Sequence, residues 1–446
     1  MQEPTKDELV NELPKNPFPI TDTSPERVSA EVPAPTRRVG PVFIAAYAAA
    51  YFGTWMALLT PIIVALPLRI AQIDAKGEAG DLSLILGIGA IFALVANPLF
   101  GKLSDRTRSR FGMRRPWIIG GVITGTIGIL MIALAPAVPL ILVGWCLAQT
   151  GFNALLAVLV AVLPDQVPEE QRGTVSGVLG MCQNVGIVAG VFLAQAVAGL
   201  AGATFLMFML PTAICLILVL LFVFVLRDRR LDRTQQLPPY GVGEFLRSFW
   251  VNPRRYPDFG WNWLGRFLIF MGLATLLTYQ VFYLLNHLHE NPIGVGTLVF
   301  YSTLVQTILI VISSNLGGWL SDKVHRRKIF VIIAAVIYAA GLAAVAFAGS
   351  FTLFLVAIAI TGIGQGTYLA IDLALAAAVL PEGGKEAAKD LGVLNIANAL
   401  PQSLAPAIAP IFLAIGGGNN YTSLFTAAAI FALLGALAIQ PIKGVR

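Results

Sequence analysis

Two ionisable residues, Asp372 and Arg266, lie inside long apolar runs and are the first candidates for chemistry. Asp372 precedes Pro381 by nine residues, roughly 13 Å along a helix, and Arg266 follows Asp258 by eight residues, roughly 12 Å. A carboxyl group that exchanges a proton and a guanidinium that stays charged would suit a proton-coupling pair at one depth. A structural ion pair between two helices is the plain alternative, and the sequence leaves both open.

Amide and aromatic side chains recur at spacings of three and four residues in four apolar runs, so each set follows one helical face. Amides offer donors and acceptors together and aromatic rings offer flat apolar surfaces, which is the chemistry that a sugar requires. The predicted substrate-binding residues are Tyr51, Trp55, Gln149, Asn153, Gln365, Tyr368, Asn395 and Asn398. For any single amide, hydrogen bonding between neighbouring helices explains its presence equally well.

The loop sequence 101–117, GKLSDRTRSRFGMRRPW, joins two apolar runs and gathers six basic residues around one acid, Asp105. A shorter copy, GWLSDK, follows at 318–323, so Asp322 matches Asp105 at an offset of 217 residues. The tripeptide Val-Leu-Pro at 162–164 returns at 379–381 with the same offset. Two unrelated landmarks that share one offset, close to half of the 446 residues, indicate an internal duplication.

The composition is typical of a polytopic membrane protein: 57% of the residues are hydrophobic, only 12% are charged, and the mean hydropathy is +0.78. The net charge of +6 is spread over the loops, which favours membrane orientation and argues against nucleic acid as a partner. All three cysteines lie in apolar runs and are expected to be free thiols. The three histidines have no metal-ligand spacing, and no metal or cofactor is expected.

Apolar runs long enough to cross a bilayer core of about 30 Å occur twelve times, six on each side of a polar stretch. The expected fold is therefore an all-α membrane protein whose twelve transmembrane helices form two pseudo-symmetric six-helix bundles. The expected parts are a disordered tail at 1–40, bundles at 41–226 and 259–440, a linker at 227–258 and a short tail at 441–446.

The positions of the basic residues predict the orientation in the membrane. If the N-terminus is cytoplasmic, 27 of the 30 Lys and Arg residues fall on the cytoplasmic side. Both termini are therefore expected inside a multi-pass protein of the cell membrane, embedded in lipid. Every third predicted helix lacks Asn, His and charge in its interior, so these helices are expected to face lipid while the others surround a central path.

The run 105–116, which reads DRxxSRFGxRRP, resembles the first cytoplasmic motif of the major facilitator superfamily. Its longer form is similar to the sucrose and glycoside-pentoside-hexuronide:cation symporter branch. Further matches are PDQVP at 164–168, Arg172-Gly173, Trp263 and Arg266-Phe267. The resemblance covers about residues 41–440 and implies two six-helix bundles with a central site that opens to each side in turn.

The resemblance also implies that the loop around Asp105 holds a closure between the bundles on the cytoplasmic side. This is physically reasonable because a helix dipole favours a carboxylate near a helix N-terminus and arginines give it charge-assisted partners. The implied gating residues are Gly101, Asp105, Arg106, Arg110, Gly112, Arg114, Arg115 and, in the degenerate second copy, Asp322. A purely topogenic role would explain the arginines but leaves Asp105 without a reason.

One position departs from the plant sucrose/proton symporters that the motif resembles. Those proteins have an aspartate in the fourth helix, sixteen residues before the acid that ends it. Counting back from Asp165 reaches Gln149, which cannot titrate. A proton would therefore need another carrier, and the candidate pair is Asp372 with Arg266.

The expected function is secondary active transport by alternating access, most simply symport of a sugar or glycoside with a proton. The driving force would be a proton or other cation gradient, and the chain is expected to be a monomer. The alternative is a proton-driven exporter of apolar or cationic small molecules, whose site would be mostly apolar with an acid. An enzyme would need a clustered nucleophile, a metal set or paired acids, and a channel would not need a duplicated fold with a lock.

Overall fold

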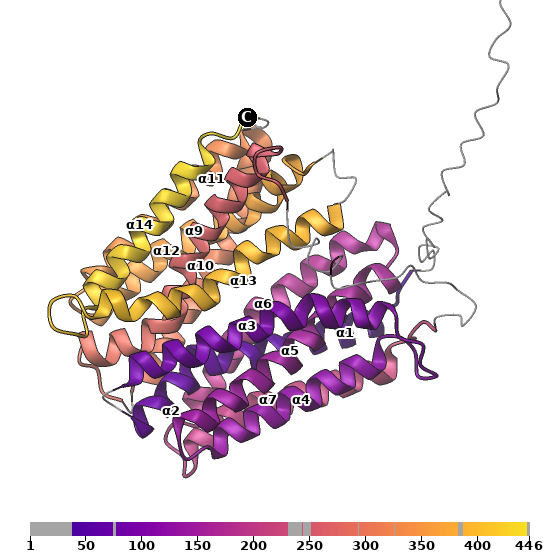
Figure 1. Ribbon diagram of the computed structural model, residues 1–446, viewed down its shortest axis with the longest axis horizontal. Coiled ribbons are helices and arrows are strands. Elements are labelled where there is room, and N and C mark those ends of the chain that lie inside the picture. The colour runs from indigo at the N-terminus through magenta and orange to yellow at the C-terminus, as the bar shows by residue number, and fades with distance from the viewer. Residues whose placement is uncertain are drawn as a thin grey trace, which may run out of the picture.

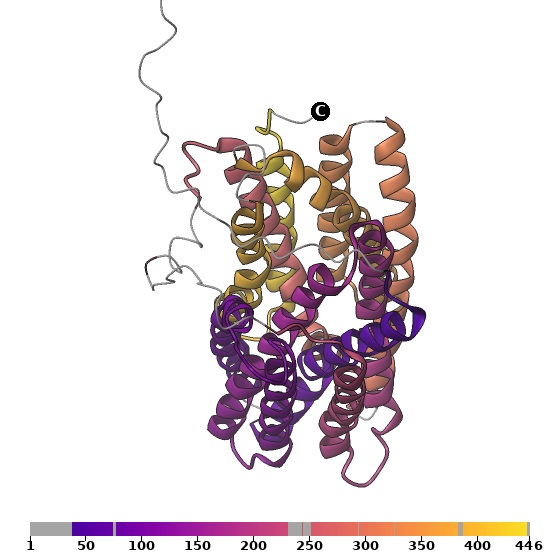
Figure 2. The same ribbon diagram turned by 90° about the vertical axis from the view of Figure 1, so that its right-hand side faces the viewer.

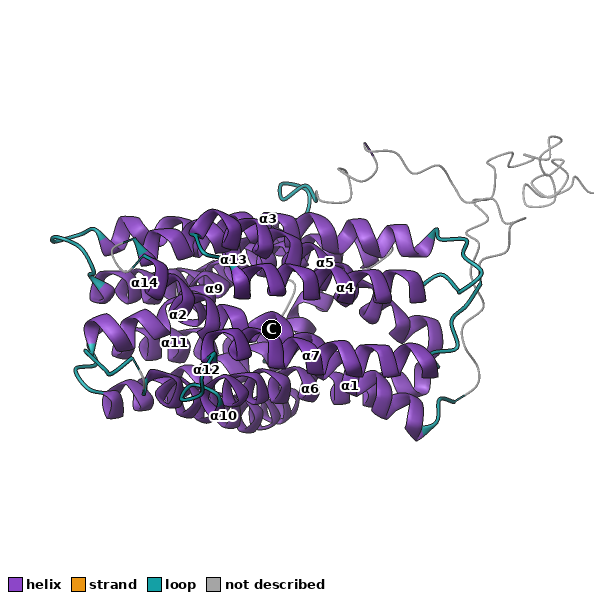
Figure 3. Cartoon of the chain, turned by 90° about the horizontal axis from the view of Figure 1, so that it is seen from below, coloured by secondary structure: helices purple, strands orange, loops and turns teal. Residues whose placement is uncertain are grey.

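The computed structural model describes residues 38–74, 77–230, 243, 251–292, 294–324, 326–381 and 387–443. Over these ranges every regular element is a helix (Figure 3), and twelve segments are long and apolar enough to cross a membrane. This confirms the predicted all-α membrane fold with twelve spanning helices. Most of the predicted tails and linker lies outside the described residues.

Six spans form each half of the chain (Figure 1). The first half contains α1 (Pro41–Thr60), a π-helical turn η1 (Pro61–Ala65), α2 (Leu66–Ile73), α3 (Glu78–Asp105), α4 (Arg115–Leu134), α5 (Val138–Gln166), α6 (Glu169–Ala196) and α7 (Ala203–Val225). The second half contains α9 (Pro257–Phe282), a π-helical turn η2 (Tyr283–His287), α10 (Val295–Val324), α11 (Arg327–Ala346), α12 (Phe351–Ala378), α13 (Ala387–Leu413) and α14 (Tyr421–Ile439). Proline in the first turn starts α1, α4, α5 and α9, where its missing N–H costs nothing.

Glycines bring helices close together in both halves. Between α4 and α5, a Cβ on Gly151 would lie 2.3 Å from the backbone nitrogen of Gly125. Between α11 and α12, a Cβ on Gly341 would lie 2.7 Å from the backbone nitrogen of Thr361. Close packing at glycine thus occurs in both halves, although these two contacts do not share the 217-residue offset of the duplicated loop.

Contacts between the halves are carried mainly by α3 against α13 and by α6 against α10, with a smaller contribution from α9 against η1. Figure 1 shows α3 and α13 next to each other, and Figure 2 shows them along one side of the molecule. The main contacts of α4, α7, α11 and α14 lie within their own halves. These four helices thus lie away from the main contacts between the halves, and their facing lipid stays a prediction.

Because the number of spans is even, the described ends at Arg38 and Lys443 lie on one side of the bundle, here called the termini face (Figure 1). The starts of α3 and α10 lie on the other side, here called the opposite face. Three hydrogen bonds join the halves there: Ser83 Oγ with Tyr279 Oη at 2.5 Å, Asn286 Nδ2 to Glu78 Oε1 at 2.5 Å, and Gln195 Nε2 to Thr297 Oγ1 at 3.3 Å. The two halves are therefore fastened to each other at the opposite face.

Helix α13 contains three internal prolines, Pro401, Pro406 and Pro410. Proline has no N–H, so Pro410 cannot donate to the carbonyl oxygen of Pro406 one turn earlier. Tyr279 of α9 donates its hydroxyl hydrogen to that oxygen instead, at 3.4 Å. A carbonyl group freed by proline is thus satisfied by a neighbouring helix, as backbone within a membrane requires.

Candidate functional site

The predicted pair is in contact: Arg266 on α9 donates from Nη1 to Asp372 Oδ2 on α12. Their side chains are only 7% and 1% exposed. Tyr368 lies one turn before Asp372 and donates its hydroxyl hydrogen to Oδ1 at 2.9 Å, so both carboxylate oxygens are bonded. The matched depths in the sequence correctly predicted the contact between α9 and α12. A buried charge of this kind is stable only while its partner stays in place.

A polar chain leads from this pair along α13. Arg266 Nε donates to Asn398 Oδ1 at 2.5 Å, and its guanidinium lies 5.6 Å from the ring centre of Phe270. Asn398 Nδ2 donates in turn to Asn395 Oδ1 at 3.3 Å, and Gln402 Nε2 reaches the Asn398 carbonyl at 3.5 Å. Asn398 and Gln402 are one helical turn apart, so polar groups continue from the ion pair toward the centre of the protein.

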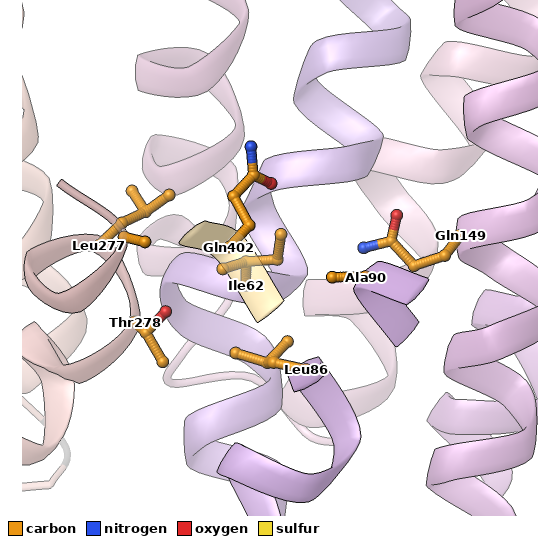
Figure 4. Close-up of a pocket in the computed structure, with 8 residues that line it drawn as sticks. Ile62, Leu86, Ala90, Gln149, Leu277, Thr278 and Gln402 are labelled. Carbon is orange, nitrogen blue, oxygen red and sulfur yellow. The ribbon is translucent and has the colours of Figure 1, made fainter. Parts of the chain in front are cut away.

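A pocket lies between the two halves near the middle of the helices (Figure 4). Its volume is about 20 Å³, room for about one water molecule and far below the range for small-molecule sites. Its lining residues come from both halves: Ile62, Leu86, Ala90, Gln149, Ala274, Leu277, Thr278 and Gln402. Figure 4 shows Gln149 on one side of this space and Gln402 with Thr278 on the other. A ligand here would touch both halves at once.

Gln149 lines this pocket and is oriented by its own helix. Asn153, one turn later on α5, donates from Nδ2 to Gln149 Oε1 at 2.8 Å and to the Gln149 carbonyl at 2.9 Å. The amide oxygen of Gln149 is therefore held, and Figure 4 shows its nitrogen turned toward Ala90 in the pocket. Gln149 is thus placed to donate a hydrogen bond to a ligand.

The other predicted substrate residues lie away from this pocket. Tyr51 and Trp55 form a tilted ring pair on α1 with centroids 6.2 Å apart, packed against the hydrophobic core. Gln365 accepts a hydrogen bond from Gln306 of α10 at 3.2 Å, which is the interhelical role that single amides often have. Tyr368 is engaged with Asp372. The predicted substrate contacts of these residues stay predictions.

The predicted substrate-binding set omits two polar pocket residues, Gln402 and Thr278. Gln402 continues the polar face of Asn395 and Asn398 at the same spacing, so the signal for it was present. Thr278 gives no such signal, because threonine is frequent in these helices and its neighbours in sequence do not distinguish it.

At the termini face, Arg114 connects the ends of three helices. It forms ion pairs with Asp105 Oδ1 and Asp165 Oδ2, both at 2.7 Å, and donates from Nη1 to Ser104 Oγ at 2.5 Å. Burial lowers the pKa of the Arg114 guanidinium, but the charges of Asp165 and Asp105 outweigh this and raise the pKa above its usual value. All of these partners belong to the first half, so these bonds do not join the two halves.

The expected dipole argument for Asp105 is wrong. Asp105 is the last residue of α3, and a carboxylate is disfavoured at a helix C-terminus. The carboxylate at the start of α4 is Asp228, whose Oδ2 accepts hydrogen bonds from the backbone nitrogens of Arg114 and Arg115 at 2.7 Å each. Burial raises the pKa of the Asp228 carboxyl group, and these two hydrogen bonds and the arginine charges only partly offset it.

Gly112 is required by the position of Asp228. Its φ is +105°, and a Cβ on it would lie 2.1 Å from Asp228 Oδ2. Gly101 is different, because the nearest atom to an added Cβ is the Ala157 side chain at 3.8 Å. The motif therefore contains one glycine that the backbone and the neighbouring carboxylate demand and one that could be substituted.

The remaining predicted gating residues surround this cluster. Arg115 donates to the carbonyl of Leu226, Arg110 is exposed with its guanidinium 5.0 Å from the ring centre of Phe111, and Arg106 is half-buried just after α3. The side chain of Asp322 lies outside the described part of the chain. A gating role for the set stays a prediction.

Twelve helices in two similar halves, with a pocket that both halves line, are the arrangement of membrane transporters that alternate access to a central site. The family model of the Major Facilitator Superfamily matches residues 43–316 and 287–443, and the chain belongs to this family. It is a transporter and not an enzyme.

Relatives match this chain over limited lengths. The multidrug efflux pump Tap of Mycolicibacterium fortuitum is 33% identical over 144 residues, which are 32% of this chain and 34% of that protein. An uncharacterized symporter of Synechocystis is 42% identical over 79 residues, 18% of this chain and 14% of the relative. The nitrite extrusion protein of Bacillus subtilis is 25% identical over 306 residues, 67% of this chain and 71% of the relative. The matched segments thus span only a third and a seventh of the first two relatives.

Solved structures share the fold at low sequence identity. A bacterial homolog of the human lysosomal transporter Spinster, in an inward-facing conformation, is 17% identical with a TM-score of 0.68 over 90% of this chain and 95% of that one. The nucleoside transporter NupG is 12% identical with a TM-score of 0.71, covering 90% and 99%. A D-xylose-proton symporter is 16% identical with a TM-score of 0.67, covering 91% and 98%.

Proposed function

We propose that this protein is a proton-coupled symporter of a sugar or glycoside that works by alternating access in the cell membrane, with both termini cytoplasmic. The observation that carries the proposal is the buried Arg266–Asp372 pair and its link through Asn398 and Gln402 to the pocket between the halves. An ionisable pair at this depth is costly in a membrane, and proteins retain such pairs where they serve transport.

Proton coupling would follow from a change in the distance between the two charges. While Arg266 contacts Asp372, the carboxylate form is favoured by the positive charge and by the Tyr368 hydroxyl group. If α9 moves away from α12, the carboxyl group is left in an apolar setting that favours its protonated form. Proton uptake and release would then be tied to the movement of α9, a helix that also lines the pocket through Thr278.

A sugar is supported by the amides on the two sides of the pocket, Gln149 and Gln402, which can donate to and accept from hydroxyl groups. The similarity of the run 105–116 to the sucrose and glycoside symporter branch points the same way. The D-xylose-proton symporter has the same fold, although a fold alone does not specify a substrate.

The second candidate is export of an apolar or cationic compound, and a specific observation favours it. Five of the eight residues that line the pocket are apolar: Ile62, Leu86, Ala90, Ala274 and Leu277. The matched proteins named a multidrug efflux pump and a nitrite extrusion protein are exporters by name. The two candidates differ in which side the substrate accumulates on when a proton gradient is applied.

The test is uptake by proteoliposomes with and without a pH gradient, using a panel of sugars, glycosides and apolar cations. We expect a sugar to accumulate with the gradient, and Asp372→Asn to abolish accumulation while exchange of substrate across the membrane continues. Asp74→Asn is the matched control, because Asp74 is exposed near the opposite face and asparagine keeps its acceptor for Gly77 N. Proton-driven movement of apolar cations alone would favour the exporter.

The proposed orientation has its own measurement. A single cysteine in the 227–258 segment should resist impermeant thiol reagents in intact cells, while a cysteine at Asn291 should react. The three native cysteines are first replaced by serine or alanine. Labelling of the 227–258 cysteine from outside would contradict cytoplasmic termini.

A further inference from the structure

We infer that the Tyr279 hydroxyl group is a hydrogen-bond switch, which helps to hold the opposite face closed and also lowers the free energy needed to open it. With the face closed, this hydroxyl group bonds Ser83 of the other half. With the face open, its hydrogen goes to the Pro406 carbonyl oxygen of its own half. The inference rests on the alternation in the proposed function and needs neither the sugar nor the proton.

The contacts of two buried hydroxyl groups give the first step. Tyr279 is 0% exposed and Ser83 is 5% exposed. Ser83 Oγ lies 2.5 Å from Tyr279 Oη and 2.6 Å from the Ala79 carbonyl oxygen. Tyr279 Oη also lies 3.4 Å from the Pro406 carbonyl oxygen. Each hydroxyl group has one hydrogen, so two hydrogens serve three contacts, and the Tyr279 hydrogen is shared between Ser83 and Pro406.

The two acceptors of Tyr279 belong to different halves of the protein. Ser83 lies on α3 of the first half, whereas Pro406 lies on α13, which packs against α9 within the second half. When the halves separate at the opposite face, Ser83 leaves with α3 and Pro406 stays beside Tyr279. The hydroxyl group therefore keeps an acceptor during the movement, and the cost of an unpaired buried donor is avoided.

Pro406 can serve as the second acceptor because of Pro410. A helical carbonyl group ordinarily accepts a hydrogen bond from the N–H four residues later, and Pro410 has no N–H to donate. The Pro406 oxygen thus keeps room for a side-chain donor whether the opposite face is closed or open. The proline four residues after the acceptor is the sequence feature that creates the switch.

The switch lies beside the pocket, on the side of the opposite face. Each of its three residues is within about one helical turn of a residue that lines the pocket: Ser83 of Leu86, Tyr279 of Thr278, and Pro406 of Gln402. Helix α3 begins at the opposite face, and α9 and α13 end there, so the switch lies between the pocket and that face. Its bond between the halves therefore helps to close the pocket on this side.

The test measures how often the opposite face is open. Nitroxide labels are attached to cysteines at Gly199, between α6 and α7, and at Gly349, between α11 and α12, in a chain without its three native cysteines. Both glycines are exposed, and a Cβ added to either has no neighbouring atom within 4 Å. Pulsed electron double resonance on the full chain in lipid nanodiscs should give a short distance for the closed face and a long distance for the open face.

Two single variants should change the ratio of open to closed molecules in opposite directions. Ser83→Ala removes a bond between the halves that only the closed face has, and we expect the ratio to rise about two- to tenfold. Pro410→Ala supplies an N–H to the Pro406 oxygen, so that the Tyr279 hydroxyl group loses its free acceptor on opening. We expect the ratio to fall by a similar factor.

Tyr279→Phe separates the switch from a change in the helix itself. The effect of Pro410→Ala on the ratio should disappear when Tyr279→Phe is also present, because the hydroxyl hydrogen is then gone. Pro401→Ala is the matched control, because it also restores an N–H to α13 but lies nine residues, about 13 Å, before Pro410. Its effect on the ratio should be the same with and without Tyr279→Phe.

Each outcome decides. Opposite shifts in Ser83→Ala and Pro410→Ala, the second abolished by Tyr279→Phe, would support the switch. An equal ratio in Pro410→Ala and the wild type, or a fall that persists with Tyr279→Phe, would overturn the switch and leave alternation standing. If Pro410→Ala does not fold, Ser83→Ala decides, and a ratio equal to that of the wild type would overturn the switch. One unchanging distance in every variant would overturn the switch and the proposed alternation together.

Discussion

Two buried arginines, Arg114 and Arg266, have the same kind of surroundings, but the carboxylates that pair with them differ in their access to water. Each contacts a carboxylate and a neutral oxygen acceptor, and their side chains are 5% and 7% exposed. The carboxylates differ: Asp105 is 43% exposed, whereas Asp372 is 1% exposed. Arg114 also has a second carboxylate, from Asp165.

This difference predicts losses of stability of different size when either ion pair is broken. Water and a second acid can compensate Arg114 for the loss of Asp105, so that pair contributes little by itself. The Asp372 side chain is 1% exposed, and among the described residues Arg266 is the cation that contacts it, so loss of Arg266 leaves a buried charge alone. The comparison also shows that both arginines join helices of one half, while the bonds between the halves lie at the opposite face.

The largest expected effect is that of Arg266→Ala. It leaves Asp372 buried without its cation, and we expect a loss of about 3–5 kcal/mol in stability. Thermal unfolding of the purified protein in detergent measures this. Adding Asp372→Asn to Arg266→Ala should restore most of the stability. Full recovery of concentrative uptake in this double variant would mean that the pair is structural and the proton is carried elsewhere.

The next effect is that of Tyr368→Phe, which removes the hydroxyl donor from the second oxygen of Asp372. Hydrogen bonds to charged groups contribute about 1.5–3 kcal/mol, and little water can reach this one to replace it. Unfolding midpoints of the wild type and Tyr368→Phe give the value. Tyr301→Phe is the control, because Tyr301 is exposed on α10. Equal unfolding midpoints for Tyr368→Phe and the wild type would contradict the exclusion of water from the Asp372 carboxylate.

The third prediction concerns Gly112, which lies against Asp228 beside Arg114. Gly112→Ala tests the position of the Asp228 carboxylate, which sequence reasoning missed. A Cβ there collides with Asp228 and takes a backbone conformation that alanine disfavours, at a cost of about 1–3 kcal/mol. Gly101→Ala is the matched control from the same motif and should be nearly neutral. The ranking of the two unfolding midpoints checks the prediction, and a reversed ranking would contradict it.

The smallest effect on stability is expected for Asp105→Asn, about 0–1 kcal/mol, because Asp105 is partly exposed and Asp165 still holds Arg114. If the loop also gates, transport should fall by more than this stability change explains, with ligand affinity preserved. Initial uptake rates and ligand-induced thermal shifts separate the two. If Asp105→Asn is expressed normally and transports at the wild-type rate, the loop does not gate and serves only to orient the protein in the membrane.

The sequence was sufficient for features that depend on local pattern. Twelve apolar runs predicted twelve spans, and depth counted from helix ends predicted the contact of Arg266 with Asp372. Asp228 could not be found in this way, because its partners Arg114 and Arg115 are more than 110 residues earlier and no pattern links them. The dipole argument for Asp105 was wrong for a similar reason, because an apolar run does not indicate the exact residue at which α3 ends.

The lining of the pocket shows the same limit of prediction from local sequence pattern. Gln149 belonged to a regular polar face, but Thr278 lines the pocket only because α9 meets α3 and α13 at that height. Contacts between the halves depend on the tilt of whole helices, which periodicity within one helix does not encode. Pocket residues such as Thr278 can be identified only when the relative positions of the two halves are known.

The prolines of α13 determine how this helix deforms. Pro401, Pro406 and Pro410 leave the carbonyl groups of Ala397, Gln402 and Pro406 outside the helical hydrogen-bond ladder, on successive turns. Bending is therefore spread over a long elastic zone and is not confined to one sharp hinge. Helix α13 can therefore bend gradually along its contact with α3, whereas α12, which carries Asp372, has no internal proline to interrupt its hydrogen-bond ladder.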